Sequence, residues 1–218
     1  MKTPLWIIAN YSTNLCILHK RKMLHIKSFV FGPFQENTYV LSDDNGTGII
    51  VDPGCYEPAE QQQLCDYIEN NDIQIAQIIN THCHIDHVLG NEFVKQHFQV
   101  PLAIPKGEKE VFLAVQSYAP VYGFHKYREA EIDQYIDEHD SISFGDITLK
   151  VLSVPGHSPG HLAFYHPESK CCLSGDVLFL GSIGRTDLPG GDHQTLIDSI
   201  HQKMFSLPAE TTVYSGHG

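Results

Sequence analysis

Seven consecutive residues carry most of the chemistry in this sequence. Positions 81–87 read Thr-His-Cys-His-Ile-Asp-His, which places the side chains of His82, His84, Asp86 and His87 within six positions. Neutral imidazole and carboxylate are the ligands that zinc and similar divalent cations prefer. The His-x-His alternation directs two rings to the same side of an extended loop. The stretch therefore predicts a metal site, and Asp86 and His87 can face a second ion.

The elements on either side of this cluster indicate how it is positioned. Residues 73–80 form an apolar run typical of a buried strand, and residues 88–98 have the apolar spacing of a helix. The cluster then occupies a strand-to-helix loop, a common location for functional residues. A histidine-rich surface tract or a single structural zinc site is the alternative, but neither requires a strand before and a helix after.

Three further segments in the second half end on potential ligands beside a glycine. They are Pro-Gly-His-Ser-Pro-Gly-His at 155–161, Ser-Gly-Asp at 174–176 and Ser-Gly-His at 215–217. Glycine permits a tight turn that lets a neighbouring side chain point into a shared cleft. Each segment alone is weak evidence for a metal site, since Gly-Asp is usually a turn and a lone histidine is usually a polar residue at a strand end. Together with the first cluster they supply two complete ligand sets.

The remaining pattern predicts strands and helices in each half of the chain. We expect helices at 57–71, 108–118 and 193–204, besides the one at 88–98, and strands at 24–31, 36–42, 48–51, 100–104, 141–144, 147–154, 162–166, 171–174 and 212–214. Residues 119–135 read as a loop, either a lid over a pocket or a segment packed on the body. This order predicts an α+β fold, a four-layer αββα sandwich of two packed mixed sheets with helices outside.

Composition narrows the class of protein. The 218 residues, 42% of them hydrophobic, suffice for one sizeable core, and we expect one domain at 23–218 after an N-terminal extension at 1–22. The net charge of −12 disfavours nucleic acid as a partner. No apolar run approaches the roughly 20 residues that cross a bilayer, so no membrane association is expected. Six scattered cysteines without paired spacing favour reduced thiols and a cytoplasmic location.

The ordered motifs Thr-His-x-His-x-Asp-His, Pro-Gly-His-Ser-Pro-Gly-His, Gly-Asp and Gly-His resemble those of the metallo-β-lactamase superfamily. The resemblance runs from about residue 23 to the end of the chain. Within it, Gly-Asp-Val-Leu-Phe-Leu-Gly-Ser-Ile-Gly-Arg-Thr-Asp-Leu-Pro-Gly-Gly-Asp at 175–192 is similar to the short glyoxalase II-like hydrolases of bacteria. This long motif is far more specific than Gly-Asp alone.

The resemblance implies a ligand set for two divalent ions, zinc by expectation, with iron and manganese as alternatives. One ion would be held by His82, His84 and His157, the other by Asp86, His87 and His217, with Asp176 bridging them. His161 would then orient a ligand through a hydrogen bond, and strand-end packing is the alternative role for it.

The implied chemistry is hydrolysis of a small acyl-thioester substrate, as in S-2-hydroxyacylglutathione hydrolases. Two ions lower the pKa of a bridging water from about 15.7 to near 7, which makes hydroxide available at neutral pH. Asp86 would be catalytic because it can accept a hydrogen bond from that water. A thiol with a pKa of about 8.5 leaves without an acid, whereas an amine must first be protonated.

The sequence departs from the glyoxalase II enzymes in ways that leave the substrate open. Those enzymes have a further C-terminal helical domain that helps bind glutathione, and this sequence ends at Gly218. Relatives also continue past the final Gly-His-Gly, so a last segment missing from this sequence is one interpretation. Arg185 stands where they use a basic residue near glutathione, but Asp187 replaces their usual tyrosine. Arg185 would bind a substrate carboxylate or pair with Asp187 or Asp192.

Three other functions compete with thioester hydrolysis. A mononuclear iron persulfide dioxygenase shares the histidine cluster and a similar Gly-Arg-Thr-Asp segment, but those proteins tend to have cysteine at the position of His161. A metallo-hydrolase of another ester or lactone, or a metal-binding protein without turnover, is also compatible with the ligand set. The sequence does not identify the acyl group, the thiol carrier, the resident metal or the oligomeric state.

Overall fold

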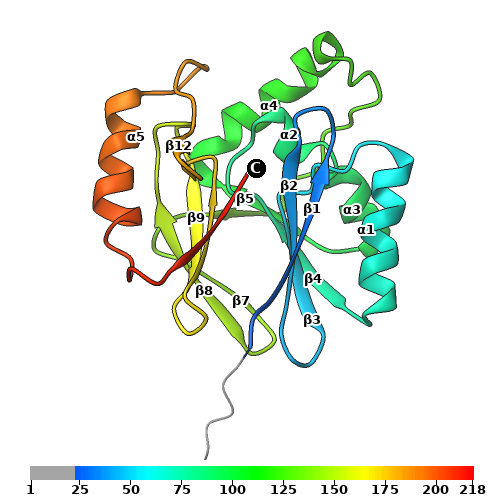
Figure 1. Ribbon diagram of the computed structural model, residues 1–218. Coiled ribbons are helices and arrows are strands. Elements are labelled where there is room, and N and C mark those ends of the chain that lie inside the picture. The colour runs from blue at the N-terminus through cyan, green and yellow to red at the C-terminus, as the bar shows by residue number, and fades with distance from the viewer. Residues whose placement is uncertain (1–22) are drawn as a thin grey trace, which may run out of the picture.

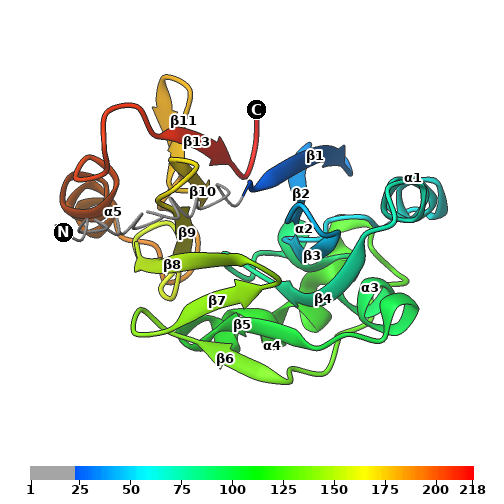
Figure 2. The same ribbon diagram turned by 90° about the horizontal axis from the view of Figure 1, so that it is seen from below.

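Two β-sheets pack face to face between outer layers of helices (Figure 1). The computed structural model describes residues 23–218, so the extension expected at 1–22 lies outside the described residues. Seen from below, helix α5 lies outside one sheet and helices α1 and α3 lie outside the other (Figure 2). The predicted αββα sandwich is confirmed.

The first sheet has six strands in the order β1-β2-β3-β4-β5-β6. The bounds are β1 His25–Phe31, β2 Glu36–Ser42, β3 Thr47–Val51, β4 Gln74–Ile79, β5 Leu102–Pro105 and β6 Gln134–Ile136. Strands β1 to β3 form the predicted antiparallel meander, and β3 to β6 run parallel. The whole of β2 is buried, as expected for a strand covered on both faces.

The second sheet has five strands in the order β13-β10-β9-β8-β7, and a separate hairpin follows β10. The bounds are β7 Ser141–Phe144, β8 Ile147–Ser153, β9 Leu162–His166, β10 Cys171–Gly175, β13 Thr212–Ser215, and β11 Leu178–Phe179 with β12 Ser182–Ile183 in the hairpin. Only β10 and β13 pair in parallel, so this sheet is also mixed. Phe144 pairs with Ile147, which makes Gly145-Asp146 the predicted two-residue turn.

Helices cover the outer face of each sheet. They are α1 Pro58–Asn70, α2 Ile85–Val88, α3 Asn91–Phe98, α4 Lys109–Tyr118 and α5 His193–Ser199, with 3-10 turns at Lys106–Glu108 and Ala119–Tyr122 and a π-helical segment at Ile200–Met204. Helix α1 begins with a capping box between Glu57 and Glu60 and has Pro58 in its first turn. Within residues 23–218, no helix combines the length and the apolar character that a membrane span requires.

Three apolar clusters hold the layers together. The middle one lies between the sheets and includes Leu41, Ile49, Leu149 and Phe164. A second joins the first sheet to α1, α3 and α4, and a third joins the second sheet to α5. Burial of apolar surface on both faces of both sheets fixes their register, because a one-residue slip would turn these side chains outward.

The helix expected at 88–98 is broken in the structure, where α2 ends at Val88 and α3 begins at Asn91. Gly90 separates them and donates its N–H to the carbonyl of Pro53 at 2.7 Å. A Cβ at this position would lie 2.6 Å from Cys55 Sγ, so only glycine permits the close approach. The short α2 is thereby free to take its own direction, and it carries Asp86 and His87.

The prediction of a loop at 119–135 is wrong at its end. Strand β6 begins at Gln134 there and extends the sheet beside β5. Its three residues have too little apolar pattern to identify a strand from sequence. Asp133 anchors it instead, because its carboxylate accepts hydrogen bonds from the Leu102 N–H at 2.7 Å and from Lys95 Nζ at 2.5 Å.

The five cysteines between residues 23 and 218 are free thiols. Cys55, Cys65, Cys83 and Cys172 are buried, and Cys171 is half-buried. Burial raises the pKa of the Cys172 thiol to about 12. A thiol of that kind is a packing group rather than a nucleophile.

Candidate metal centre

The seven predicted ligands come together at one edge of the sandwich, where four strands end. The loop after β4 and helix α2 supply four of them, and the segments after β8, β10 and β13 supply one each, namely His157, Asp176 and His217. In Figure 1 this is the edge where α2 and the C-terminus lie. Residues more than one hundred positions apart in sequence thus share one site.

The first group consists of His82, His84 and His157. One ligand atom from each residue lies within 4.8 Å of the others. Nδ1 of His84 and Nε2 of His157 are 2.9 Å apart, and the ring centroid of His82 lies 4.8 Å from that of His84. Three imidazole nitrogens therefore converge on one point.

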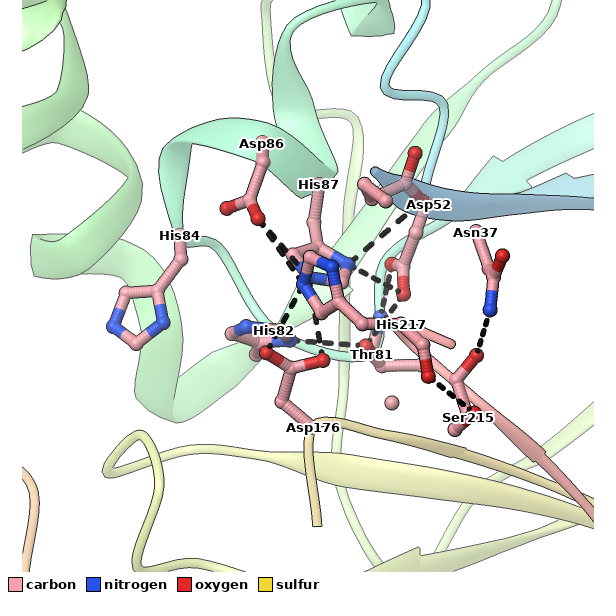
Figure 3. Close-up of polar contacts among 12 residues, drawn as sticks. Asn37, Asp52, Thr81, His82, His84, Asp86, His87, Asp176, Ser215 and His217 are labelled. Carbon is pink, nitrogen blue, oxygen red and sulfur yellow. Dashed lines mark hydrogen bonds and ion pairs between the residues drawn. The ribbon is translucent and has the colours of Figure 1, made fainter. Parts of the chain in front are cut away.

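The second group consists of Asp86, His87 and His217, whose ligand atoms also lie within 4.8 Å of one another. Oδ2 of Asp86 is 3.2 Å from Nε2 of His217 and 3.8 Å from Nε2 of His87. Both histidines and the carboxylate face a common centre (Figure 3).

Asp176 joins the two groups. Its Oδ2 lies 3.5 Å from Nε2 of His157 in the first group and 3.4 Å from Nε2 of His217 in the second. Its Oδ1 lies 3.5 Å from Nε2 of His87. One carboxylate thus reaches histidines of both groups, which is the position that a bridging ligand requires.

The second ring nitrogen of the histidines is held by acceptors outside the centre. Nδ1 of His157 donates to the Arg185 carbonyl at 2.8 Å, and Nδ1 of His217 donates to the Phe34 carbonyl at 3.0 Å. Since a carbonyl can only accept, Nδ1 of each ring carries a hydrogen, and Nε2 is the nitrogen left to coordinate an ion.

Unpartnered buried atoms show that this donor set fits metal ions. Within residues 23–218, Nε2 of His82, Nε2 of His87 and Oδ1 of Asp176 are buried without a hydrogen-bond partner. Leaving such an atom unsatisfied costs about 1–3 kcal/mol, which coordination would offset. Burial lowers the pKa of His84 to about 4 and that of His82 well below its usual range. Neutral imidazoles are the form that binds a cation, so these two residues of the first group need not lose a proton to do so.

Asp52 supports histidines of both groups and was not identified from the sequence. Its carboxylate accepts hydrogen bonds from the Thr81 N–H and hydroxyl, both at 2.6 Å, and from Nδ1 of His87 at 3.2 Å. The Thr81 hydroxyl oxygen in turn lies 3.1 Å from Nδ1 of His82. Asp52 could form a third metal-capable group with His82 and His87, but these bonds already engage both its oxygens. The signal in the sequence that could have identified Asp52 is its position directly after a buried strand.

Glu108 was also missed, and it connects the two ligand loops. This fully buried carboxylate accepts hydrogen bonds from the Cys83 N–H at 2.9 Å, the Ser158 hydroxyl at 2.7 Å and the Gly160 N–H at 2.6 Å. Cys83 lies between two ligands of the first loop, and Ser158 follows the ligand of the second. No sequence pattern marks a glutamate in a short 3-10 turn as a buried residue.

His161 lies beneath the first group rather than in it. Its ring is fully buried and stacks on His82 with centroids 4.6 Å apart. Its Nε2 accepts the backbone N–H of Asp176 at 3.1 Å, so that lone pair is already used. The role of orienting ligands stays a prediction. The stacking on His82 and the hydrogen bond from the Asp176 N–H are the contacts through which His161 would orient them.

Arg185 lies at the margin of the site with its side chain 61% exposed. Its guanidinium forms two hydrogen bonds to the Asp187 carboxylate, at 2.7 Å and 2.6 Å. Of the two roles open from the sequence, the structure shows the pairing with Asp187.

Comparison with known proteins agrees with this geometry. The sequence profile described as the metallo-beta-lactamase superfamily matches residues 31–217. The probable metallo-hydrolase YqgX of Bacillus subtilis is 37% identical over 86% of this chain and 87% of that protein. The hydroxyacylglutathione hydrolase GloC of Haemophilus influenzae is 35% identical, over 85% and 86%. The mitochondrial persulfide dioxygenase ETHE1 of Homo sapiens is 29% identical, over 83% of this chain but 63% of its own length.

Two solved structures superpose closely on the fold. The B3 metallo-beta-lactamase BLEG-1 has a TM-score of 0.81 at 35% identity and covers 89% of this chain and 92% of its own. TTHA1623, crystallised in a di-iron-bound form, has a TM-score of 0.78 at 34% identity and covers 88% and 92%. The histidine and aspartate groups of this chain are consistent with a binuclear site.

The different positions of His157 and His161 lead to opposite results on substitution. We expect His157→Ala to lose one metal ion per chain, because it removes an Nε2 that faces the centre. His161→Ala should keep both ions, because its Nε2 serves a backbone N–H. Metal analysis of the purified variants after dialysis measures this, and the reverse pattern would overturn the assignment.

Glu108→Ala should destabilise the metal-free protein by about 3 kcal/mol, because it leaves the buried Cys83 N–H and Ser158 hydroxyl and the part-buried Gly160 N–H without an acceptor. It should also weaken metal binding, because the two ligand loops are no longer tied together. Lys109→Ala, an exposed neighbour, is the matched control. Denaturant unfolding and metal titration measure the two effects, and a variant as stable as the control would contradict the connecting role.

Proposed function

Because the chain belongs to the metallo-beta-lactamase superfamily, we propose that it is a metal-dependent hydrolase whose substrates are small acyl thioesters. The observation that carries this proposal is the carboxylate of Asp176, which lies within 3.5 Å of histidines from both groups. That arrangement suits two divalent ions, zinc being the expected metal. His82, His84 and His157 would hold one, and Asp86, His87 and His217 would hold the other.

The ions, when bound, would supply an acidified water near neutral pH and a positive charge for the acyl oxygen. Asp86 would orient the attacking water. Its two ion-pair contacts, with His87 and His217, both use Oδ2, and the residue lines the cavity beside the centre. Oδ1 would then be the oxygen left to accept a hydrogen bond from the water.

The reaction adds water to the acyl carbon and breaks the C–S bond, giving a carboxylic acid and a thiol. A thiol of pKa about 8.5 departs as the thiolate, so no group on the chain has to deliver a proton. The relative named hydroxyacylglutathione hydrolase supports this reaction class.

A persulfide dioxygenase with one iron is the second candidate, favoured by the similarity to ETHE1. One feature of this chain weighs against it. His161 occupies the position where we expect cysteine in that branch.

Thiol release from a thioester panel, followed beside oxygen uptake with glutathione persulfide, tests the function. The protein loaded with zinc should release thiol, and the protein loaded with iron should release thiol without consuming oxygen. Asp176→Ala should lose both metal content and at least about 100-fold in kcat/KM, because the carboxylate shared by the two groups is gone. Oxygen uptake with one iron per chain, or full activity in the variant, would refute the proposal, and turnover of esters or lactones alone would redirect it to another substrate.

A further inference from the structure

A cavity of about 940 Å³ opens directly onto the proposed metal centre. Five of the proposed ligands form its floor, namely His84, Asp86, His157, Asp176 and His217. A substrate that reaches the floor with its acyl carbon must therefore place the rest of its structure along the walls. The chemistry of the walls then decides which substrates bind well.

One wall is aromatic and comes from two distant parts of the chain. Phe34 lies in the turn between β1 and β2, while Tyr118 and Tyr122 end α4 and the following 3-10 turn. The Phe34 and Tyr122 ring centroids are 6.2 Å apart, and those of Tyr118 and Tyr122 are 5.9 Å apart. Edge contacts of this kind hold the rings as one surface.

A second wall is aliphatic and comes from the β11–β12 hairpin and the segment after it. Ile183, Leu188 and Pro189 line it, and the Phe179 ring lies 6.2 Å from the ring of the proposed ligand His217. On the aromatic side Phe34 is 40% exposed and Tyr122 is 56% exposed. Large apolar side chains left open to solvent beside a reactive centre are typical of a site that covers an apolar ligand.

Charges on the described walls do not suit glutathione, which carries two carboxylates. Arg185 is the one lysine or arginine among the lining residues of the described chain, and its guanidinium is already paired with Asp187. Glu110, also on the wall, adds a negative charge. A peptide carboxylate in this cavity would have to displace Asp187 from Arg185 before it met a cation of these walls.

Resting on the proposed function, we infer that the preferred substrates are thioesters whose arm in this cavity is uncharged and apolar. A straight-chain acyl group on a neutral thiol has this chemistry, and an alkyl thiol carrying a short acyl group has it too. Burying each methylene against these walls strengthens binding of the arm about fourfold.

Matched thioesters separate charge from chain length and acyl side from thiol side. Lactoyl thioesters of glutathione and of neutral N-acetylcysteamine differ in carrier charge. Butanoyl and hexanoyl thioesters of N-acetylcysteamine differ by two acyl methylenes, and acetyl thioesters of ethanethiol and butanethiol differ by two on the thiol side. We expect kcat/KM to be higher with the neutral lactoyl thioester than with S-lactoylglutathione. We also expect kcat/KM to rise about 15-fold with two added methylenes, in the acyl pair if the acyl chain enters the cavity and in the thiol pair if the thiol chain does.

Two neighbouring positions on α4 provide a variant and its control. Ala114 lines the cavity, while Leu113 does not, and both are exposed enough to accept an arginine. Ala114→Arg should lower kcat/KM for the hexanoyl thioester at least tenfold and raise the relative rate with S-lactoylglutathione. Leu113→Arg should leave both within about twofold.

Binding of inert thioethers gives a readout independent of turnover. S-hexyl-N-acetylcysteamine should bind more tightly than S-methylglutathione in calorimetry, with a negative heat-capacity change from apolar burial. A tenfold preference of the unchanged protein for S-lactoylglutathione over the neutral lactoyl thioester would overturn this inference alone. Absence of turnover with every thioester would overturn the proposed function and the inference with it.

Discussion

The carboxylate of Asp176 reaches histidines from two separate groups, and the rest of the site depends on that contact. Its two oxygens lie within 3.5 Å of His87, His157 and His217, which follow three different strands or turns. No short segment could bring these side chains together. The register of both sheets therefore determines the geometry, and the apolar cluster between the sheets keeps that register. The packing that stabilises the sandwich therefore also determines the shape of the metal centre.

Two buried carboxylates outside the ligand set maintain this arrangement locally. Asp52 holds His87 directly and His82 through Thr81, so it acts on both groups from behind. Glu108 binds backbone and side-chain donors of both ligand loops. Burying a carboxylate is unfavourable unless its oxygens are fully hydrogen-bonded, and here each accepts several donors. These residues position ligands, whereas the apolar walls of the cavity select substrates, so the two tasks fall on different parts of the chain.

Repeated local patterns in the sequence predicted the sandwich and the segments that carry the ligands, whereas the resemblance to the metallo-β-lactamase superfamily implied which residues share each ion. Apolar alternation marked most strands, and glycine beside histidine or aspartate marked where the strands end. Gly90 shows what such patterns miss, since its close approach to Cys55 splits a helix that the apolar spacing continues. The strand β6 depends on hydrogen bonds from Leu102 and Lys95 to Asp133, which are visible only in three dimensions. Asp52 and Glu108 were not predicted because the sequence does not distinguish a buried carboxylate from an exposed one.

A count of the metal ions needed for hydrolysis tests the central claim most directly. Metal-free protein is titrated with zinc while thiol release is followed with the fastest thioester of the panel. If Asp176 joins two sites, activity should reach its plateau at two equivalents of zinc per chain. A plateau at one equivalent, with no further binding, would contradict a binuclear centre.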